Sequence, residues 1–159
     1  MDAGDVYRQL APAVLGYLRA QRVPEPDDLL GEVFVQVARS LPRFGGDGDE
    51  DLRRWVFTIA RNRVIDDSRR RARRARLRGL VPITEETGRP EDPFDPDLLR
   101  AMGVLTPEQR EVVALRFIAD LSLEDVARIT RRTRGAVKAM QARGLANLAR
   151  ALDPTSSAE

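Results

Sequence analysis

The C-terminal third of the chain carries the pattern that most constrains its fold: two short helical segments separated by four polar residues. Ser122 can cap the first segment, and Asp125 three positions later approximates a capping box. Thr133 ends the polar stretch and can cap the second segment. Such a pair is typical of a helix–turn–helix, although the segment taken alone would also suit a plain helical hairpin.

The second segment, which starts at residue 134, has two chemically different sides. Val137, Leu145 and Leu148 lie roughly on one side, so we expect them to face the core. The opposite side carries basic residues that suit phosphates and base edges in a DNA major groove, namely Arg134, Lys138 and Arg143. This division is typical of a DNA-recognition helix.

The segment just upstream also has clear helix signals. Thr106 can cap a helix that has Pro107 at its first position and Gln109 completing a capping box. With it, residues 105–152 closely resemble region 4 of the bacterial sigma-70 superfamily. The family's typical motifs are matched at residues 105–112, 120–127 and 135–138.

Two positions depart from the region 4 pattern. Arg131 and Arg132 occupy a turn in which the family commonly has Gly followed by an apolar residue, and Gln141 stands where an apolar core residue is usual. Either the turn is strained, or its arginines have been recruited to DNA phosphates.

The composition excludes several kinds of chemistry. The 159 residues include no Cys and no His, which removes disulfides, thiolate metal sites and the commonest general base. No apolar run approaches about 18 residues, the length that a membrane-spanning helix needs. We therefore expect a soluble cytoplasmic protein, and the resemblance to the sigma-70 superfamily implies that it is not an enzyme and has no metal or cofactor.

Charge is segregated along the chain, although the formal net charge is only +2. Residues 61–78 hold nine arginines against Asp66 and Asp67, whereas residues 79–103 hold six acidic residues, two arginines and four prolines. The basic block favours an anionic partner, and the acidic stretch is predicted to be a flexible linker.

Upstream of the linker, the hydrophobic spacing predicts three helices and no strand. They would cover residues 6–18, residues 27–41 with a cap at Asp27 or Asp28, and a third helix from about Leu52 into the arginine block, after a loop at 44–51. Their inward stripes are Val6, Leu10, Val14 and Leu18; Leu30, Phe34, Val37 and Leu41; and Leu52, Trp55, Val56 and Ile59.

The predicted fold is all-α, with two small helical domains joined by a flexible linker. The expected boundaries are 1–78 for the first domain, 79–103 for the linker, 104–153 for the second domain and 154–159 for a disordered tail.

The N-terminal helices resemble region 2 of the same superfamily. Region 2.2 is matched within residues 27–38, where Gly31 replaces a usual Gln, and regions 2.3 and 2.4 are matched within residues 52–66. An acidic region 1.1 and a folded region 3 are both missing, which is the pattern of the extracytoplasmic-function (ECF, group 4) subfamily.

This resemblance implies a sigma initiation factor, which binds core RNA polymerase and directs promoter recognition and DNA melting at the −10 and −35 elements. The implied partners are the polymerase, through its β′ clamp helices and β flap, and promoter DNA; an anti-sigma factor is a further candidate. Trp55 is expected to pack in the core.

The resemblance and the charge pattern together give three sets of candidate binding residues. The −10 strand is assigned to Asn62, Arg61, Arg53, Arg54, Arg63, Asp66, Arg69, Arg70 and Phe44, with Asn62 reading a base edge. The −35 duplex is assigned to Thr133, Arg134, Lys138, Arg143, Arg131 and Arg132. The polymerase clamp is assigned to Asp28, Leu29, Glu32 and Gln36.

Two other functions remain to be weighed. A stand-alone helix–turn–helix repressor would leave the N-terminal domain unexplained. A metal-dependent nuclease would use the clustered carboxylates Asp47, Asp49, Glu50 and Asp51. These four lie in one predicted loop without a His or Lys partner.

Overall fold

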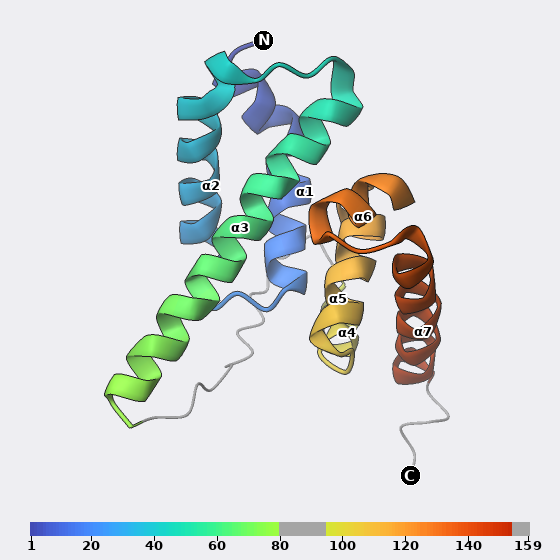
Figure 1. The fold of residues 1–159 in the computed structure, drawn as a ribbon. Helices are drawn as coiled ribbons and strands as arrows, with labels where there is room; N and C mark the ends of the chain where they lie inside the picture. The colour runs from blue at the N-terminus through green and yellow to red at the C-terminus, as the bar shows by residue number, and fades with distance from the viewer. Residues whose placement is uncertain (80–94, 154–159) are drawn as a thin grey trace.

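The computed structural model describes residues 1–79 and 95–153, and these residues form helices and no strand, which confirms the all-α prediction. The N-terminal half holds α1 (Ala3–Ala20), α2 (Pro26–Ser40), η1 (Leu41–Arg43) and α3 (Gly48–Leu77). The C-terminal half holds α4 (Pro96–Met102), α5 (Pro107–Val113), the π-helical turn η2 (Ala114–Ile118), α6 (Leu123–Thr130) and α7 (Arg134–Leu152). Figure 1 shows α1, α2 and α3 as one bundle, with α4 to α7 beside it.

Helix α1 is built on the predicted stripe. Its four stripe residues, Val6, Leu10, Val14 and Leu18, are fully buried. Pro12 lies inside the helix on its exposed side and does not end it.

Helix α2 starts one residue before the predicted caps. Pro26 occupies the first position, where its missing N–H costs nothing, and Glu25 takes the cap position without a side-chain bond. The prediction that Asp27 or Asp28 caps this helix is therefore wrong. Both lie in the first turn, where a negative charge favours the positive end of the helix dipole.

Helix α3 begins earlier than predicted and continues through the arginine block to Leu77. Gly48 has a φ of +80°, a left-handed conformation that glycine adopts without strain. Asp49, Glu50 and Asp51 form the acidic first turn, so the predicted loop 44–51 is wrong over its second half. Along the stripe, Leu52 and Val56 are buried, while Trp55 and Ile59 are partly buried against the core.

Helix α4 lies inside the stretch 79–103 that was predicted as linker. Asp95 caps it, since the Asp97 N–H donates to Asp95 Oδ1 at 2.9 Å, and Pro96 is its first residue. Ala101 and Met102 are buried, so the predicted linker is wrong at its C-terminal end. Most of the linker, 80–94, and the predicted disordered tail, 154–159, lie outside the described residues.

The predicted cap of α5 is confirmed. Thr106 Oγ1 accepts a hydrogen bond from the Gln109 N–H at 3.2 Å, and the Gln109 side chain accepts one from the Thr106 N–H at 3.3 Å. Leu145 on α7 is 37% exposed, so its predicted place in the core is wrong, whereas Val137 and Leu148 are buried.

Close packing of α7 on α5 depends on Gly144. A Cβ added at this buried position would lie 2.9 Å from Val113 Cγ2, closer than two carbon atoms approach without a shift. The glycine therefore lets the two helices approach each other, which fixes the direction in which the outer face of α7 points.

The two halves of the molecule pack against each other. Helix α1 lies against α4 and η2, and α3 lies against α6. One continuous hydrophobic cluster draws buried residues from both halves. Over residues 1–79 and 95–153, no helix combines the length and the apolar content that crossing a membrane requires.

Candidate nucleic-acid interface

The outer face of α7 is exposed and basic. Thr133 caps the helix as predicted, with its Oγ1 accepting a hydrogen bond from the Ala136 N–H at 3.1 Å. Because Val137 faces inward, Lys138 and Arg143 lie on the solvent side. Neither of these two side chains forms an ion pair within the described part of the chain. The face assigned to the −35 duplex is open.

The turn between α6 and α7 is strained, one of the two outcomes left open by the sequence. Arg131 adopts the left-handed conformation, with φ 56° and ψ 42°. A side chain costs about 1–2 kcal/mol in this conformation, which is why glycine is common at such a position. The N–H of Arg132 donates to the Ala127 carbonyl at 3.0 Å, so the turn still satisfies the end of α6.

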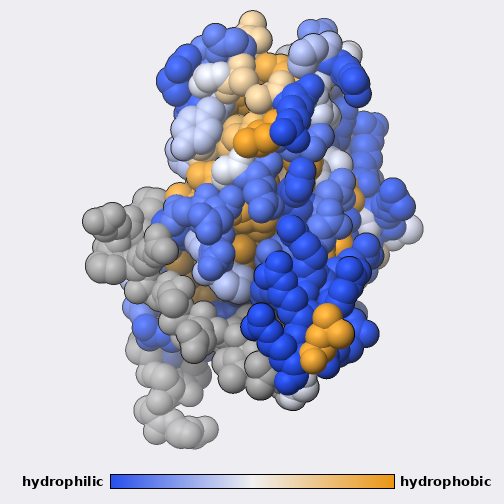
Figure 2. Space-filling view, turned by 90° about the vertical axis from the view of Figure 1, so that its left-hand side faces the viewer, coloured by the Kyte–Doolittle hydropathy of each residue, from blue (hydrophilic) through white to orange (hydrophobic). Residues whose placement is uncertain are grey.

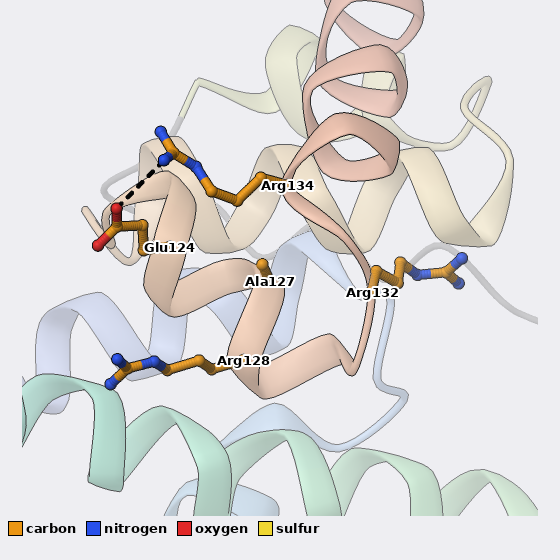
Figure 3. Close-up of a pocket in the computed structure, with 5 residues that line it drawn as sticks. All are labelled: Glu124, Ala127, Arg128, Arg132 and Arg134. Carbon is orange, nitrogen blue, oxygen red and sulfur yellow. Dashed lines mark ion pairs between the residues drawn. The ribbon is translucent and has the colours of Figure 1, made fainter.

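A shallow, open hollow of about 390 Å³ lies between α6 and the start of α7. Its lining comprises Glu124, Ala127, Arg128, Arg132 and Arg134. Figure 3 shows the three arginine side chains extending from the two helices and the turn between them, with Arg134 paired to Glu124 at 3.3 Å. Arg128 and Arg134 extend to one side and Arg132 to the other, and guanidinium groups of this kind suit the phosphates of a DNA backbone.

Arg128 was missed by the sequence analysis. It belongs to the first helix of the pair, whereas the prediction considered only the turn and the second helix. Its spacing of four residues from Glu124 places both on one face of α6, and this spacing could have identified it.

Gln141, the second departure from the region 4 pattern, is satisfied by a polar partner. Its side-chain oxygen accepts a hydrogen bond from Arg116 Nε at 3.2 Å, and Arg116 also donates to the Leu121 carbonyl at 2.8 Å. Arg116 thus links α7 to η2 and to the loop before α6.

The first half of α3 differs from α7, because its arginines already have partners in the C-terminal half. Arg53 donates to the Ala119 carbonyl at 3.0 Å, and Arg61 donates to the Ile129 carbonyl at 3.3 Å. Both arginines were assigned to the −10 strand, and in this structure each donates one hydrogen bond from its NH1 to the C-terminal half.

Arg54 forms an ion pair across the same contact. Its NH1 lies 3.1 Å from Asp125 Oδ1, and its NH2 lies 3.1 Å from Asp51 on its own helix. The hydrogen bond with Asp125 raises the pKa of Arg54 above its usual value. Ser122 caps α6 as predicted, but the Asp125 carboxylate, expected to complete a capping box, points instead to Arg54.

Three elements meet beside Arg61. Its Nε lies 3.2 Å from Glu111 of α5, an ion-pair distance without hydrogen-bond geometry, and both side chains are about one fifth exposed or less. Tyr17 of α1 is fully buried next to them, and burial raises the pKa of its hydroxyl above the usual value, with Glu111 acting in the same direction. The phenol is therefore neutral, and the charge at this junction is balanced between Arg61 and Glu111.

Further along α3, two arginines contact α2. Arg63 donates to Gln36 Oε1 at 3.1 Å, and Arg70 lies 3.6 Å from Glu32. Residues assigned to DNA therefore contact residues assigned to the polymerase clamp. Figure 2 looks at the left-hand side of Figure 1, and hydrophilic groups dominate the coloured surface at its lower right, with one hydrophobic group among them.

Other α3 residues assigned to the −10 strand face solvent. Asn62, Asp66 and Arg69 are exposed. Asn62 follows Arg61 directly in the helix, and it is exposed whereas Arg61 is partly buried.

Phe44 and Trp55 stack on each other at the start of α3. Their ring centroids are 5.0 Å apart at 34°, and both side chains are partly buried against the core. A Cβ on Gly46 would lie 2.5 Å from the Phe44 ring, so the loop passes tightly over the aromatic pair. This supports the expectation that Trp55 packs in the core, and it gives Phe44 a packing role.

The residues assigned to the polymerase clamp differ in how far their side chains are buried. Asp28 and Glu32 are exposed, and Gln36 is partly buried. Leu29 is only 4% exposed and belongs to the core. Its assignment to a docking surface is wrong for this structure, because its side chain faces the other helices.

The carboxylates considered for a nuclease do not form a metal site. Among residues 1–79 and 95–153 no group of three or more carboxylates is placed to hold a metal ion. The Asp51 carboxylate instead accepts hydrogen bonds from the Asp47 N–H and from Arg54, both at the start of α3.

Comparison with known proteins assigns both halves. The sigma-70 region 2 family matches residues 6–74, and the sigma-70 region 4 family matches residues 101–150. Among curated relatives, the ECF RNA polymerase sigma factor BldN of Streptomyces coelicolor is 33% identical over 94% of this chain, which spans only 60% of that relative's length. The ECF RNA polymerase sigma factor SigX of Bacillus subtilis is 30% identical over 89% of this chain and 77% of its own length.

A solved structure shares the fold. The sigma factor RpoE of Bartonella quintana, crystallised with the anti-sigma factor NepR, superposes with a TM-score of 0.80 at 23% identity, over 92% of this chain and 93% of that one. The family matches, the curated relatives and the helical architecture agree, and this chain belongs to the ECF family of RNA polymerase sigma factors.

Proposed function

We propose that this chain is a transcription initiation factor that binds core RNA polymerase and directs it to promoters. The observation that carries the proposal is that two separate arginine-rich surfaces lie on two halves that each match a sigma-70 region. One is the open basic face of α7 with the adjoining hollow, and the other is the arginine-rich α3 with its exposed Asn62.

The α7 surface is proposed to bind the −35 duplex. Lys138, Arg143 and Arg134 would contact phosphates or base edges in a major groove, and Arg128 and Arg132 would add phosphate contacts from the hollow. Phosphate contacts position the protein on the duplex, while sequence is read by the few side chains that reach base edges.

The α3 surface is proposed to bind the unpaired −10 strand. Asn62 has both a donor and an acceptor for a base edge, and the neighbouring arginines supply phosphate contacts. Trapping an unpaired base favours the open duplex without any covalent chemistry. The chain would therefore promote DNA melting by binding alone, and we propose that it is not an enzyme.

Three further assignments follow from the same proposal. The exposed carboxylates Asp28 and Glu32 of α2, with Gln36, would dock on the β′ clamp helices, and the C-terminal half would contact the β flap. The Bartonella neighbour was solved with an anti-sigma factor, and we propose an anti-sigma factor as a third partner. The chain would act in the cytoplasm, where the polymerase is.

Reconstituted transcription tests the proposal. The full chain is combined with core RNA polymerase, and run-off transcription is measured on a library of genomic fragments. We expect a discrete set of fragments to be transcribed only when the chain is present. Failure of the chain to co-purify with core polymerase, together with tight sequence-specific binding by the chain alone, would favour a repressor instead.

A further inference from the structure

The inward side of α7 has a polar residue in an otherwise apolar row. Four residues with spacings of four, three and four form this inward stripe: Val137, Gln141, Gly144 and Leu148. Val137, Gly144 and Leu148 are buried, and Gln141 is partly buried among them. A polar side chain in such a place lowers stability unless it is hydrogen-bonded, so its partner shows what the position is used for.

The partner of Gln141 is Arg116, which also reaches the segment before α6. Arg116 Nε donates to the Gln141 side-chain oxygen at 3.2 Å, and Arg116 NH1 donates to the Leu121 carbonyl at 2.8 Å. The guanidinium carbon lies 5.3 Å from the centroid of the Phe117 ring, so the ring lies against one face of the group. One planar, rigid group therefore joins α7, η2 and the loop that leads into α6.

This bridge constrains the orientation of α7 more than its stability. Apolar side chains of similar volume can pack in several ways of nearly equal energy. A hydrogen bond has a fixed length and direction, so one polar pair in an apolar seam can select a single register of two helices at a cost in stability. A leucine at position 141 would fill the same seam and would leave the rotation of α7 less well defined.

The orientation of α7 decides which basic side chains can reach one DNA duplex together. Lys138 and Arg143 lie on exposed positions of α7, on either side of Gln141 in the sequence. Arg128 and Arg132 belong to α6 and to the turn, so a rotation of α7 changes their spacing from Lys138 and Arg143. A duplex presents its phosphates at fixed spacings, and simultaneous contacts from both helices therefore require one orientation of α7.

We propose that Gln141 is a positioning residue for DNA binding. Through Arg116 it fixes α7 relative to α6, so that the basic residues of both helices contact one duplex at the same time. The inference rests on the proposed binding of α7 to duplex DNA. It adds a neutral residue on the inward side of the helix, whose effect on DNA is exerted through the position of α7.

A neutral substitution separates position from charge. Gln141→Leu removes the acceptor for Arg116 and keeps the side-chain size. The affinity of the full chain for a duplex of random sequence is measured over a range of salt concentrations, because the slope of log affinity against log salt reports how many phosphates are contacted at once. We expect the slope to flatten by about one unit. The melting temperature should equal or exceed that of the parent protein, because leucine replaces a polar residue in an apolar seam.

Asn147→Leu is the matched control. It also exchanges a neutral, partly buried amide on α7 for leucine. The hydrogen bond that it removes, from Asn147 to Gln109 Oε1 at 3.2 Å, joins α7 to α5 and not to the loop before α6. We expect the control to keep the slope of the parent protein.

A second variant approaches the same bridge from its other end. Arg116→Lys keeps the charge and lacks the planar fork that holds two acceptors at once. We expect it to flatten the slope as Gln141→Leu does. The double variant should flatten the slope no further than either single variant, since both remove one interaction. If Gln141→Leu does not fold, Arg116→Lys carries the same test.

Several outcomes would overturn the proposal. They are a parent-like slope in Gln141→Leu, an equal flattening in the control, and effects of the two single variants that add up in the double variant. A flatter slope together with a lower melting temperature would mean damage to the fold, and it would overturn the proposal as well. A parent protein without salt-dependent duplex binding would refute the proposed role of α7 itself, and that failure is recognised before any variant is made.

Discussion

Helices α3 and α7 are both basic and both assigned to DNA, yet their arginines are in different states. On α7, Lys138 and Arg143 face solvent. On α3, Arg54 and Arg61 are paired to carboxylates of the other half. The difference shows that a basic helix is not by itself an available DNA-binding surface; what packs against it decides which arginines can reach a phosphate.

The two helices also differ in how they are held. Helix α7 rests on α5 through Gly144, within its own half, and leaves its basic side outward. Helix α3 packs on α1 and α2 and also meets α6. A change in the packing of the two halves would therefore expose new parts of α3, while α7 would keep the same face in any arrangement.

The largest effect is expected on α3. The substitution Asn62→Ala removes a base-edge hydrogen bond, which should cost about 1–3 kcal/mol in open-complex formation on the preferred promoter. Binding to core polymerase should not change, because Asn62 is exposed and lies apart from α2. Equal transcription by mutant and parent on every promoter would reduce Asn62 to a surface residue.

A smaller effect is expected on α7. The double substitution Lys138→Ala/Arg143→Ala removes two proposed phosphate contacts, so the salt dependence of promoter binding should flatten by about one to two units of slope. The slope is measured as log affinity against log salt concentration with holoenzyme. Parent-like slopes would mean that neither side chain contacts the DNA backbone.

The smallest net effects are expected from substitutions at two glycines, one on α7 and one on α2, which packs against α3. Gly144→Ala forces a Cβ against Val113; overpacking of this kind costs about 1–3 kcal/mol and is partly offset by a helix-propensity gain of about 1 kcal/mol, so we expect a net destabilisation of up to about 2 kcal/mol. Gly31→Ala adds a Cβ into open space on α2 and should stabilise the fold by about 0.5–1 kcal/mol. Thermal unfolding of both variants checks the opposite signs, and equal shifts would contradict the packing assigned to Gly144.

The sequence predicted elements well where local chemistry decides them. Capping at Thr106, Ser122 and Thr133 requires only a hydroxyl and the backbone N–H three residues later, so it can be predicted without knowledge of the tertiary structure. The hydrophobic stripe of α1 could be predicted in the same way from its spacing. The start of α3 could not be predicted in this way, because it depends on a left-handed backbone at Gly48, which the spacing of hydrophobic residues does not reveal.

The sequence could not predict which charged residues pair across the two halves. Asp125 looked like part of a capping box, and only the packing of α6 against α3 turns its carboxylate to Arg54. Glu111 matched a family motif, and nothing near it in sequence indicates Arg61. Helix α4 was not predicted because it lies in a proline-rich acidic stretch. Pro96 was taken to interrupt helical structure, whereas proline is also favourable as the first residue of a helix.

The most direct test of the separate roles proposed for α3 and α7 is transcription initiation from two templates. Run-off transcription with reconstituted holoenzyme is compared on a duplex promoter and on the same promoter with a pre-opened −10 bubble. Lys138→Ala/Arg143→Ala should be defective in initiation on the duplex promoter, and it should initiate from the bubble template nearly as well as the parent protein. Asn62→Ala should fail on the duplex and remain impaired on the bubble. If the α7 variant is equally defective in initiation on both templates, the two helices do not divide promoter recognition as described.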